Sequence, residues 1–256
     1  MQYTRAPINL ERVLSKSNVL RVDSARWQEA QGFELQCAEQ SAPAGDDYNL
    51  WWREAFNRYE VLQGRRLPDV LEVGCGPHTN IRLILPCISF ERLWLEDPLI
   101  HTYLRLKREQ RVWRYFRCRR PLAVADLVQR YHATPLSEKL EDLLLPDKSI
   151  DLCVCINVLD HVQDAQQCIM QMCRVLKDKG ILVIGQDLSN EEDVQLCPES
   201  WNDVGHPIKM DADFLDSYLE GLMPLYRKIL PREDGRNPRC HYGTYLLIGQ
   251  QSIPQD

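Results

Sequence analysis

Residues 69–77 read DVLEVGCGP, and this stretch decides the fold class. Its apolar residues end at Gly74, which predicts a buried strand followed by a sharp turn. Glycine at positions Gly74 and Gly76 lets the backbone turn and approach a ligand without a Cβ clash, with backbone amides facing the ligand. The turn is not the dinucleotide fingerprint, because Thr79 stands where G-x-G-x-x-G requires glycine.

Strand and helix patterns alternate on both sides of this turn. We expect strands over 69–73, 93–95, 150–156, 181–185, 225–230 and 244–249, and helices over 80–85, 98–118 and 164–176, with Gly180 as the C-cap of the last helix. Such alternation predicts a mostly parallel sheet with right-handed crossovers. The last two strands are joined without a helix and should pair antiparallel.

Residues 1–66 precede the first convincing strand and have helix-like periodicity. They are expected to form an N-terminal helical cap or lid beside a domain of residues 67–256. Asp46 or Asp47 is placed to cap a helix in this segment. Aromatic residues at helical spacing either pack against the sheet or contact a substrate, and the two roles are compatible. These residues are Tyr48, Trp51, Trp52, Phe56 and Tyr59.

The second informative segment is 93–98, LWLEDP, which ends a predicted strand with two acids. In nucleotide-binding α/β folds, an acid at this place, about 20 residues after the glycine turn, holds the ribose diol. A carboxylate suits a diol because each oxygen accepts one O–H. Asp97 is preferred over Glu96, because the following Pro98 ends a strand and begins a helix. The alternative is an acid that is solvated or caps the next helix.

Four segments, in this order, resemble the motifs of the class I S-adenosylmethionine-dependent methyltransferases. They are DVLEVGCGP, LWLEDPL, LEDLLLPDKSIDLCVCINVLDHV and CRVLKDKGILVIG, all within residues 66–188. The resemblance implies a Rossmann-like, seven-stranded, mostly parallel sheet with an antiparallel C-terminal strand and helices on both faces. It also implies S-adenosylmethionine as cofactor and methyl transfer as activity.

The resemblance further implies which residues contact the cofactor. They are Glu72, Gly74, Cys75, Gly76, Asp97, Pro98, Leu140, Glu141 and Asn157. Glu72 and Gly74 should lie near the methionine moiety of the cofactor, and Asn157 should border the sulfonium.

The adenine contacts depart most from the family pattern. The backbone of Leu140 and the side chain of Glu141 or Asp142 are expected near the adenine. Lys139 stands where many relatives have an aspartate that helps to hold this base, and Pro77 replaces the common third small residue of the first motif.

Methyl transfer from a sulfonium is an in-line displacement that depends mainly on alignment and on exclusion of water. A base is needed only if the acceptor is a hydroxyl. The candidate bases are His161, after the fourth strand, and His206, in the loop after the fifth. Either histidine has a purely structural alternative. Asp187 is a further candidate that could instead cap a turn, and His78 is expected to shape the cofactor loop.

The composition limits partners and compartment. With 256 residues, 44% hydrophobic content and a net charge of −6, the chain can bury a full core, and its acidity argues against a nucleic-acid partner. No apolar run spans a bilayer, and the N-terminus lacks a signal-peptide pattern, so a cytoplasmic protein is expected. The 10 cysteines include no C-x-x-C pair, which predicts free thiols and no metal site.

The acceptor is the least determined part of the reaction. The segments INVLDHV and GQDLSNEED resemble bacterial methyltransferases of sugar or surface-polysaccharide synthesis, which implies a small-molecule or glycan acceptor, methylated at oxygen. The alternatives are an RNA methyltransferase and a non-catalytic cofactor-binding module. Basic residues over 105–120 predict a solvated helix, whereas Arg232, Arg236 and Arg239 lie in a loop that could overhang the site.

Overall fold

The computed structural model describes most of the chain. The described residues are 18–41, 48–113, 116–189, 193 and 204–252. The expected capping residues Asp46 and Asp47 therefore lie outside the described residues.

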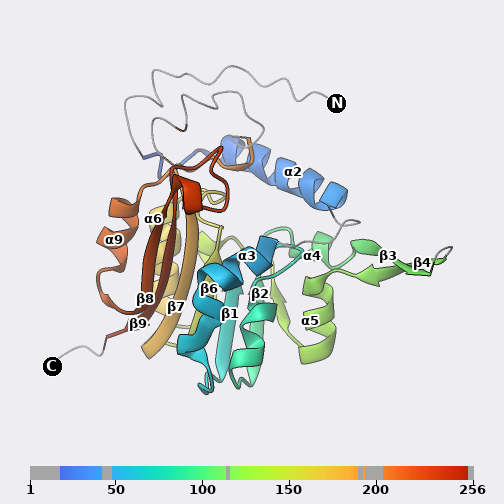
Figure 1. Cartoon of the computed structure of the whole chain (residues 1–256), viewed down its shortest axis with the longest axis horizontal. Helices are drawn as coiled ribbons and strands as arrows, with labels where there is room; N and C mark the ends of the chain where they lie inside the picture. The colour runs from blue at the N-terminus through green and yellow to red at the C-terminus, as the bar shows by residue number, and fades with distance from the viewer. Residues whose placement is uncertain (1–17, 42–47, 114–115, 190–192, 194–203, 253–256) are drawn as a thin grey trace.

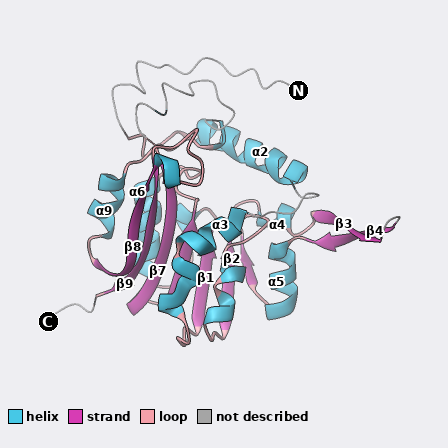
Figure 2. Ribbon diagram, viewed as in Figure 1, coloured by secondary structure: helices cyan, strands magenta, loops and turns pink. Residues whose placement is uncertain are grey.

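A seven-stranded sheet forms the centre of the molecule, in the order β5-β2-β1-β6-β7-β9-β8 (Figures 1 and 2). The strands are β1 (Asp69–Val73), β2 (Arg92–Glu96), β5 (Thr134–Leu136), β6 (Ile150–Ile156), β7 (Leu176–Leu188), β8 (Leu222–Pro231) and β9 (Gly243–Gln251). β5, β2, β1, β6 and β7 are parallel, whereas β9 runs antiparallel to both of its neighbours. The predicted fold class is therefore confirmed.

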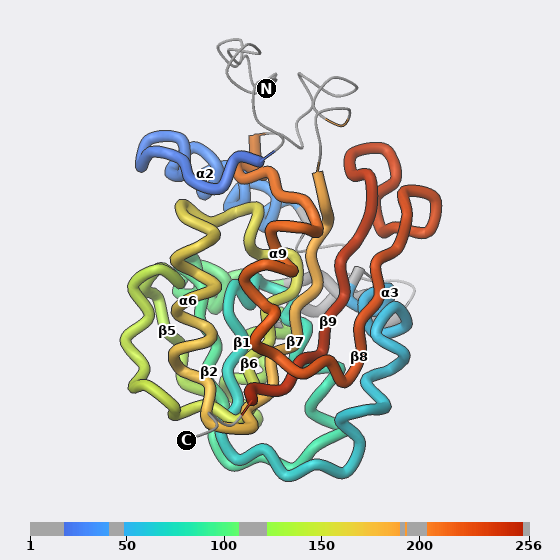
Figure 3. The backbone as a smooth tube through the Cα atoms, turned by 90° about the vertical axis from the view of Figure 1, so that its left-hand side faces the viewer, coloured from blue at the N-terminus to red at the C-terminus, as the bar shows by residue number. Residues whose placement is uncertain are grey.

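Helices cover both faces of this sheet because neighbouring strand residues point to opposite sides. The helices are α2 (Ser24–Ser41), α3 (Tyr48–Ala55), α4 (Ile100–Tyr103), α5 (Ala123–Tyr131), α6 (Ala165–Val175) and α9 (Ala212–Leu219). Val70 packs in one apolar cluster with residues of α3 and α5, and Leu71 packs in a second with residues of α6 and α9. Figure 3 shows α6 and α9 on the side of the sheet opposite α3.

The aromatic residues before the first strand belong to the first of these clusters. Trp52, Phe56 and Tyr59 are all buried against the sheet. Trp52 also lines the cavity described below, and its expected contact with a substrate stays a prediction.

The expected long helix over 98–118 is wrong. Among the described residues of this range, only α4 is helical. The chain continues as β3 (Lys107–Trp113) and β4 (Phe116–Pro121), which pair with each other apart from the central sheet and project from the molecule (Figure 1). The segment KREQR has good helix formers, but the VWRYF that follows it in the sequence is rich in β-branched and aromatic residues. α5, which was not predicted, forms the crossover from β2 to β5.

The expected C-cap at Gly180 is also wrong. Helix α6 begins at its N-cap Asp164, as the pattern predicted, but it ends at Val175, and Gly180 lies within β7. The expected helix over 80–85 is reduced to the 3-10 turns Ile81–Leu83 and Leu85–Cys87. Among the described helices, none combines the length and apolar character needed to cross a bilayer.

Candidate functional site

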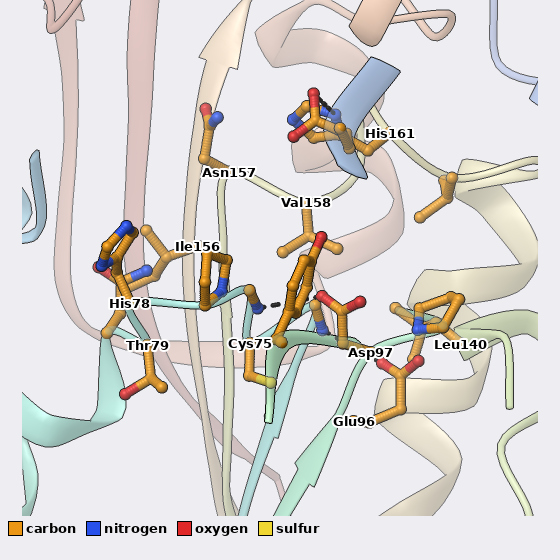
Figure 4. Close-up of a pocket in the computed structure, with 18 of the residues that line it drawn as sticks. Cys75, His78, Thr79, Glu96, Asp97, Leu140, Ile156, Asn157, Val158 and His161 are labelled. Atoms are coloured by element: carbon orange, nitrogen blue, oxygen red, sulfur yellow. Dashed lines mark hydrogen bonds and ion pairs between the residues drawn. The ribbon is translucent and has the colours of Figure 1, made fainter. Parts of the chain in front are cut away.

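A cavity of about 310 Å³ lies at the carboxyl ends of β1, β2 and β6, beneath α2. This volume falls in the range of small-molecule sites. Ligands of open α/β sheets bind at this edge, because the loops that follow the strands meet there. Figure 4 shows Glu96, Asp97 and Leu140 at one side of the cavity and Asn157 and His161 at another.

The glycine turn after β1 lines the cavity with Gly74, Cys75 and Gly76. Gly74 has φ +55° and Gly76 has φ +56°, a left-handed conformation that L side chains rarely adopt. A Cβ added at Gly74 would lie 2.4 Å from Cγ1 of Val158, whereas one at Gly76 would meet nothing within 4 Å. Gly74 thus permits close packing under the cavity, and Gly76 is required by backbone conformation alone.

The two acids at the end of β2 hold this turn in place. Gly74 N donates to Glu96 Oε2 (3.1 Å), and Gly76 N donates to Asp97 Oδ2 (3.0 Å). Cys75 N donates to the carbonyl oxygen of Glu96 (2.9 Å). The turn and the strand-end acids therefore form one unit, and both acids line the cavity.

Glu72 lies behind the turn and does not line the cavity. Its Oε1 accepts hydrogen bonds from the amides of Asn80 (2.6 Å) and Ile81 (3.1 Å). The structure therefore gives Glu72 a bracing role for the segment after the glycine turn. Its predicted proximity to the methionine moiety stays a prediction.

The buried acids give this side of the cavity its electrostatic character. Burial raises the pKa of Glu72 to about 8 and that of Asp97 to about 6, and it raises the pKa of Glu96 well above its ordinary value. Glu96 Oε1 is buried and has no hydrogen-bond partner among the described residues. A ligand that brings O–H donors or positive charge would relieve these carboxyl groups.

The predicted adenine side is formed by the 3-10 turn Leu140–Asp142. Leu140 and Glu141 line the cavity, and Glu141 Oε1 accepts a hydrogen bond from the amide of Gln163 (2.7 Å). Lys139 Nζ lies 3.9 Å from the ring centroid of Trp27 in α2. The apolar Leu140 side chain thus borders a surface where a flat base could pack.

Asn157 follows β6 and lines the cavity. With its amide oriented to satisfy both neighbours, it donates to Asp187 Oδ2 and accepts from Arg236 Nη2, each at 3.2 Å. Arg236 Nε and Nη2 also donate to Asp187 Oδ2 at 3.0 and 2.6 Å. Asp187 is thus part of a buried ion pair, and the loop expected to overhang the site brings Arg236 to the cavity.

The two candidate bases lie side by side, with ring centroids 4.4 Å apart. His161 lines the cavity, and its Nδ1 lies 2.9 Å from the carbonyl oxygen of Gly205. His161 Nε2 is 3.6 Å from Asp160 Oδ1, and His206 Nε2 is 3.7 Å from Asp160 Oδ2. Glu34 of α2 approaches His161 Nδ1 at 3.5 Å. His206 is buried behind His161 and does not line the cavity.

Opposing effects set the charges in this cluster. Burial disfavours ionisation of Asp160, but the positive charge of His161 and His206 outweighs it, so the pKa of Asp160 lies well below its usual range. Burial lowers the pKa of His161. The negative charges of Asp160 and Glu34 raise it by more than burial lowers it, so the pKa of His161 lies above its ordinary value.

Most of the predicted cofactor residues meet at one cavity. Those that line it are Gly74, Cys75, Gly76, Asp97, Pro98, Leu140, Glu141 and Asn157. The sequence analysis did not identify Trp27, Gln31 and Glu34 of α2 as lining residues. Helix periodicity predicted a lid there, but no motif marks the three residues, because their approach to the cavity depends on where α2 docks.

Known proteins resemble this chain in sequence and in fold. A family model described as a methyltransferase domain matches residues 104–184. A probable S-adenosylmethionine-dependent methyltransferase of Mycobacterium tuberculosis is 26% identical over 71% of this chain and 58% of its own length. The chain thus spans less than two thirds of this curated relative.

Two solved structures share the fold. The [4+2]-cyclase SpnF is 15% identical over 93% of this chain and 100% of its own, with a TM-score of 0.60. The 1,6-didemethyltoxoflavin-N1-methyltransferase of Burkholderia thailandensis, solved with bound S-adenosylhomocysteine, is 15% identical over 92% of this chain and 94% of its own, with a TM-score of 0.57.

Fold and cavity together define an α/β protein with a ligand-sized cavity at the carboxyl edge of a seven-stranded sheet. By these similarities, the chain resembles the S-adenosylmethionine-dependent methyltransferases, with the match to a methyltransferase domain confined to residues 104–184. The curated relative is named for S-adenosylmethionine, and the Burkholderia thailandensis enzyme holds S-adenosylhomocysteine.

Proposed function

We propose that the protein transfers a methyl group from S-adenosylmethionine to a hydroxyl of a small-molecule or glycan acceptor. The observation that carries this proposal is the unit of glycine turn and strand-end acids beside the cavity. The cofactor supplies the activated methyl group, so the protein mainly aligns the acceptor and excludes water.

The buried acids fit this cofactor. Asp97, which keeps acceptor capacity on both carboxylate oxygens, is proposed to hold the ribose diol. Glu96 Oε1 lacks a partner among the described residues and would gain a donor from the same sugar or a stabilising charge from the sulfonium. Leu140 and Glu141 are proposed beside the adenine, and Asn157 beside the sulfonium.

The acceptor end of the site supports methylation at oxygen. A hydroxyl must lose its proton as it attacks, and His161 lines the cavity with Asp160 and His206 directly behind it. Such a cluster activates a hydroxyl in one of two ways: an imidazole takes the proton, or a bound cation lowers the pKa of the hydroxyl.

The N-terminal residues 1–66 are proposed as a cap on the domain of residues 67–256. The cavity contacts of α2 and of Trp52 in α3 support this division. A cytoplasmic site of action is part of the proposal, because the described cysteines are free thiols, as expected in a reducing compartment.

Calorimetric titration with S-adenosylmethionine tests the cofactor half of the proposal. The folded wild type should bind, and Asp97→Ala should bind more weakly. Formation of S-adenosylhomocysteine with pools of phenols, sugars and amines then tests the acceptor half. Absence of cofactor binding by folded wild-type protein would contradict the proposal.

The same assays separate the alternatives. An RNA methyltransferase predicts salt-sensitive RNA binding and turnover on RNA, as expected where phosphates dominate affinity. A non-catalytic module predicts cofactor binding without turnover on any pool. Turnover on amines alone would overturn methylation at oxygen and leave the methyl-transfer proposal in place.

A further inference from the structure

Three side chains able to bind a metal ion converge at the acceptor end of the cavity. Asp160 and His161 follow β6, and His206 comes from the segment before α9. One ligand atom from each lies within 4.8 Å of the others, in a search of the described residues. This cluster combines two imidazole nitrogens with one carboxylate oxygen, a donor set that proteins use for zinc and related divalent ions.

The hydrogen bonding of His161 favours ligation. Its Nδ1 lies 2.9 Å from the carbonyl oxygen of Gly205, which can only accept, so Nδ1 carries the hydrogen. In a neutral imidazole this leaves the Nε2 lone pair, which faces Asp160 Oδ1 at 3.6 Å. A backbone carbonyl on the other ring nitrogen is the arrangement that orients metal-binding histidines.

Asp160 supplies the second observation. Its relative exposure is 4%, and apart from an interaction with the Gln186 side chain neither of its carboxylate oxygens accepts a hydrogen bond within the described part of the chain. The two imidazoles lie 3.6 and 3.7 Å away, beyond ordinary hydrogen-bond distance. A buried carboxylate in this state is costly unless it is paired or binds a metal ion.

The surrounding charges permit a cation. Arg236 is the nearby arginine that lines the cavity, and it is paired with Asp187. Lys209 Nζ donates to the backbone oxygen of His206 and is thereby directed to the main chain. Glu34 lies 3.5 Å from His161 Nδ1 and adds negative charge.

We propose that Asp160, His161 and His206 form a binding site for a divalent transition-metal ion of the zinc type. Because His161 lines the cavity, an ion bound to it would lie near the cavity wall. Mg²⁺ fits less well, because it prefers an all-oxygen shell.

This site gives His161 a ligating rather than a proton-accepting role, because a nitrogen bound to a cation cannot take a proton. The ion would stabilise the acceptor oxygen while its proton leaves to solvent. This consequence rests on the proposed methyl transfer, whereas metal binding itself does not.

The test uses the full chain freed of metal by a chelator. Calorimetry with Zn²⁺ should show one equivalent bound, and Co²⁺ should give the visible absorption of a low-symmetry nitrogen and oxygen site. Asp160→Asn and His206→Ala should each weaken binding at least about tenfold. His101→Ala, which removes an exposed histidine of α4, is the matched control and should bind like the wild type.

Two results would overturn the site. One is the absence of Zn²⁺ binding by folded wild-type protein. The other is binding that survives both substitutions or that gives the near-ultraviolet charge-transfer band of thiolate ligands, which would indicate cysteines instead. Thermal melting checks the fold of each variant, and His161→Gln replaces a variant that does not fold.

Titration with S-adenosylhomocysteine separates this inference from the proposed function. Cofactor binding without metal binding would overturn the metal site alone. Metal binding without cofactor binding would support the site and contradict the proposed function.

Discussion

Gly74 and Gly76 share one backbone conformation in different surroundings, which permits a matched comparison. An alanine at either position bears the left-handed penalty of about 1–2 kcal/mol. At Gly74 the added Cβ would also clash with Val158, whereas at Gly76 the space is open. Gly74→Ala should therefore lower the free energy of unfolding clearly more than Gly76→Ala, measured by urea denaturation. Equal losses would mean that Val158 moves aside at little cost.

Asp97 carries the pH dependence expected for cofactor binding. Burial raises its pKa to about 6, and only the ionised carboxylate can accept both hydroxyls of a diol. The affinity for S-adenosylhomocysteine should therefore fall as the pH decreases through about 6. Asp97→Asn should bind about tenfold more weakly at neutral pH, the cost of about one hydrogen bond, and should lose this pH dependence.

Glu96→Gln provides the control for Asp97. Because burial raises the pKa of Glu96 well above its ordinary value, the amide resembles the protonated acid. Calorimetry across the pH range should show a wild-type pH dependence for Glu96→Gln. An unchanged pH dependence in Asp97→Asn would contradict the ribose assignment.

At the scale of elements, strand ends and helix N-termini bring separate segments of the chain together around the cavity. Helix α6 follows directly on the Asp160 and His161 segment, and its N-cap Asp164 accepts a hydrogen bond from Gln167 N (3.0 Å). The position of this helix therefore helps to fix the His161 side of the cavity.

Removal of this N-cap should destabilise the protein. Asp164→Ala should lower the free energy of unfolding by about 1 kcal/mol, because loss of the cap leaves the amide of Gln167 without its partner. Asp164→Ser should retain most of the stability, since serine also caps. Chemical denaturation measures both variants. A loss in the serine variant as large as in the alanine variant would contradict the capping role and favour the ion pair with Arg21.

At the scale of the whole molecule, buried acids make stability depend on pH. Burial raises the pKa of Glu72 in the folded state to about 8, above its ordinary value of 4.5. The folded state therefore holds this proton more tightly than the unfolded state. The associated stability is complete below about pH 4.5 and is lost as the pH rises towards 8, at up to about 1.4 kcal/mol per pH unit.

Glu72→Gln should remove this component. The amide oxygen can still accept from Asn80 N and Ile81 N, so the variant should match the wild type in acid and exceed it above neutral pH. The free energy of unfolding measured in urea across this pH range tests the expectation. Parallel curves for the two proteins would show that Glu72 ionises freely.

The sequence determined every strand of the seven-stranded sheet except β5, and the glycine turn and acid that line the cavity, because these depend on local patterns. A buried strand that ends in G-x-G, an acid that ends the next strand and the apolar run at Ile150–Ile156 each carry a signal within a few residues. Parallel pairing then brings the ends of these strands to one edge, so Gly74, Gly76 and Asp97 meet at the cavity as the spacing indicated.

Tertiary structure alone decided the rest. The β3–β4 hairpin replaced an expected helix, since local propensity does not record which segment forms the crossover. The cluster of Asp160, His161 and His206 and the approach of Glu34 from α2 join segments far apart in the chain. No short sequence spacing predicts this cluster. The distances between its side chains depend on how loops and helices pack on the sheet, which only the folded core determines.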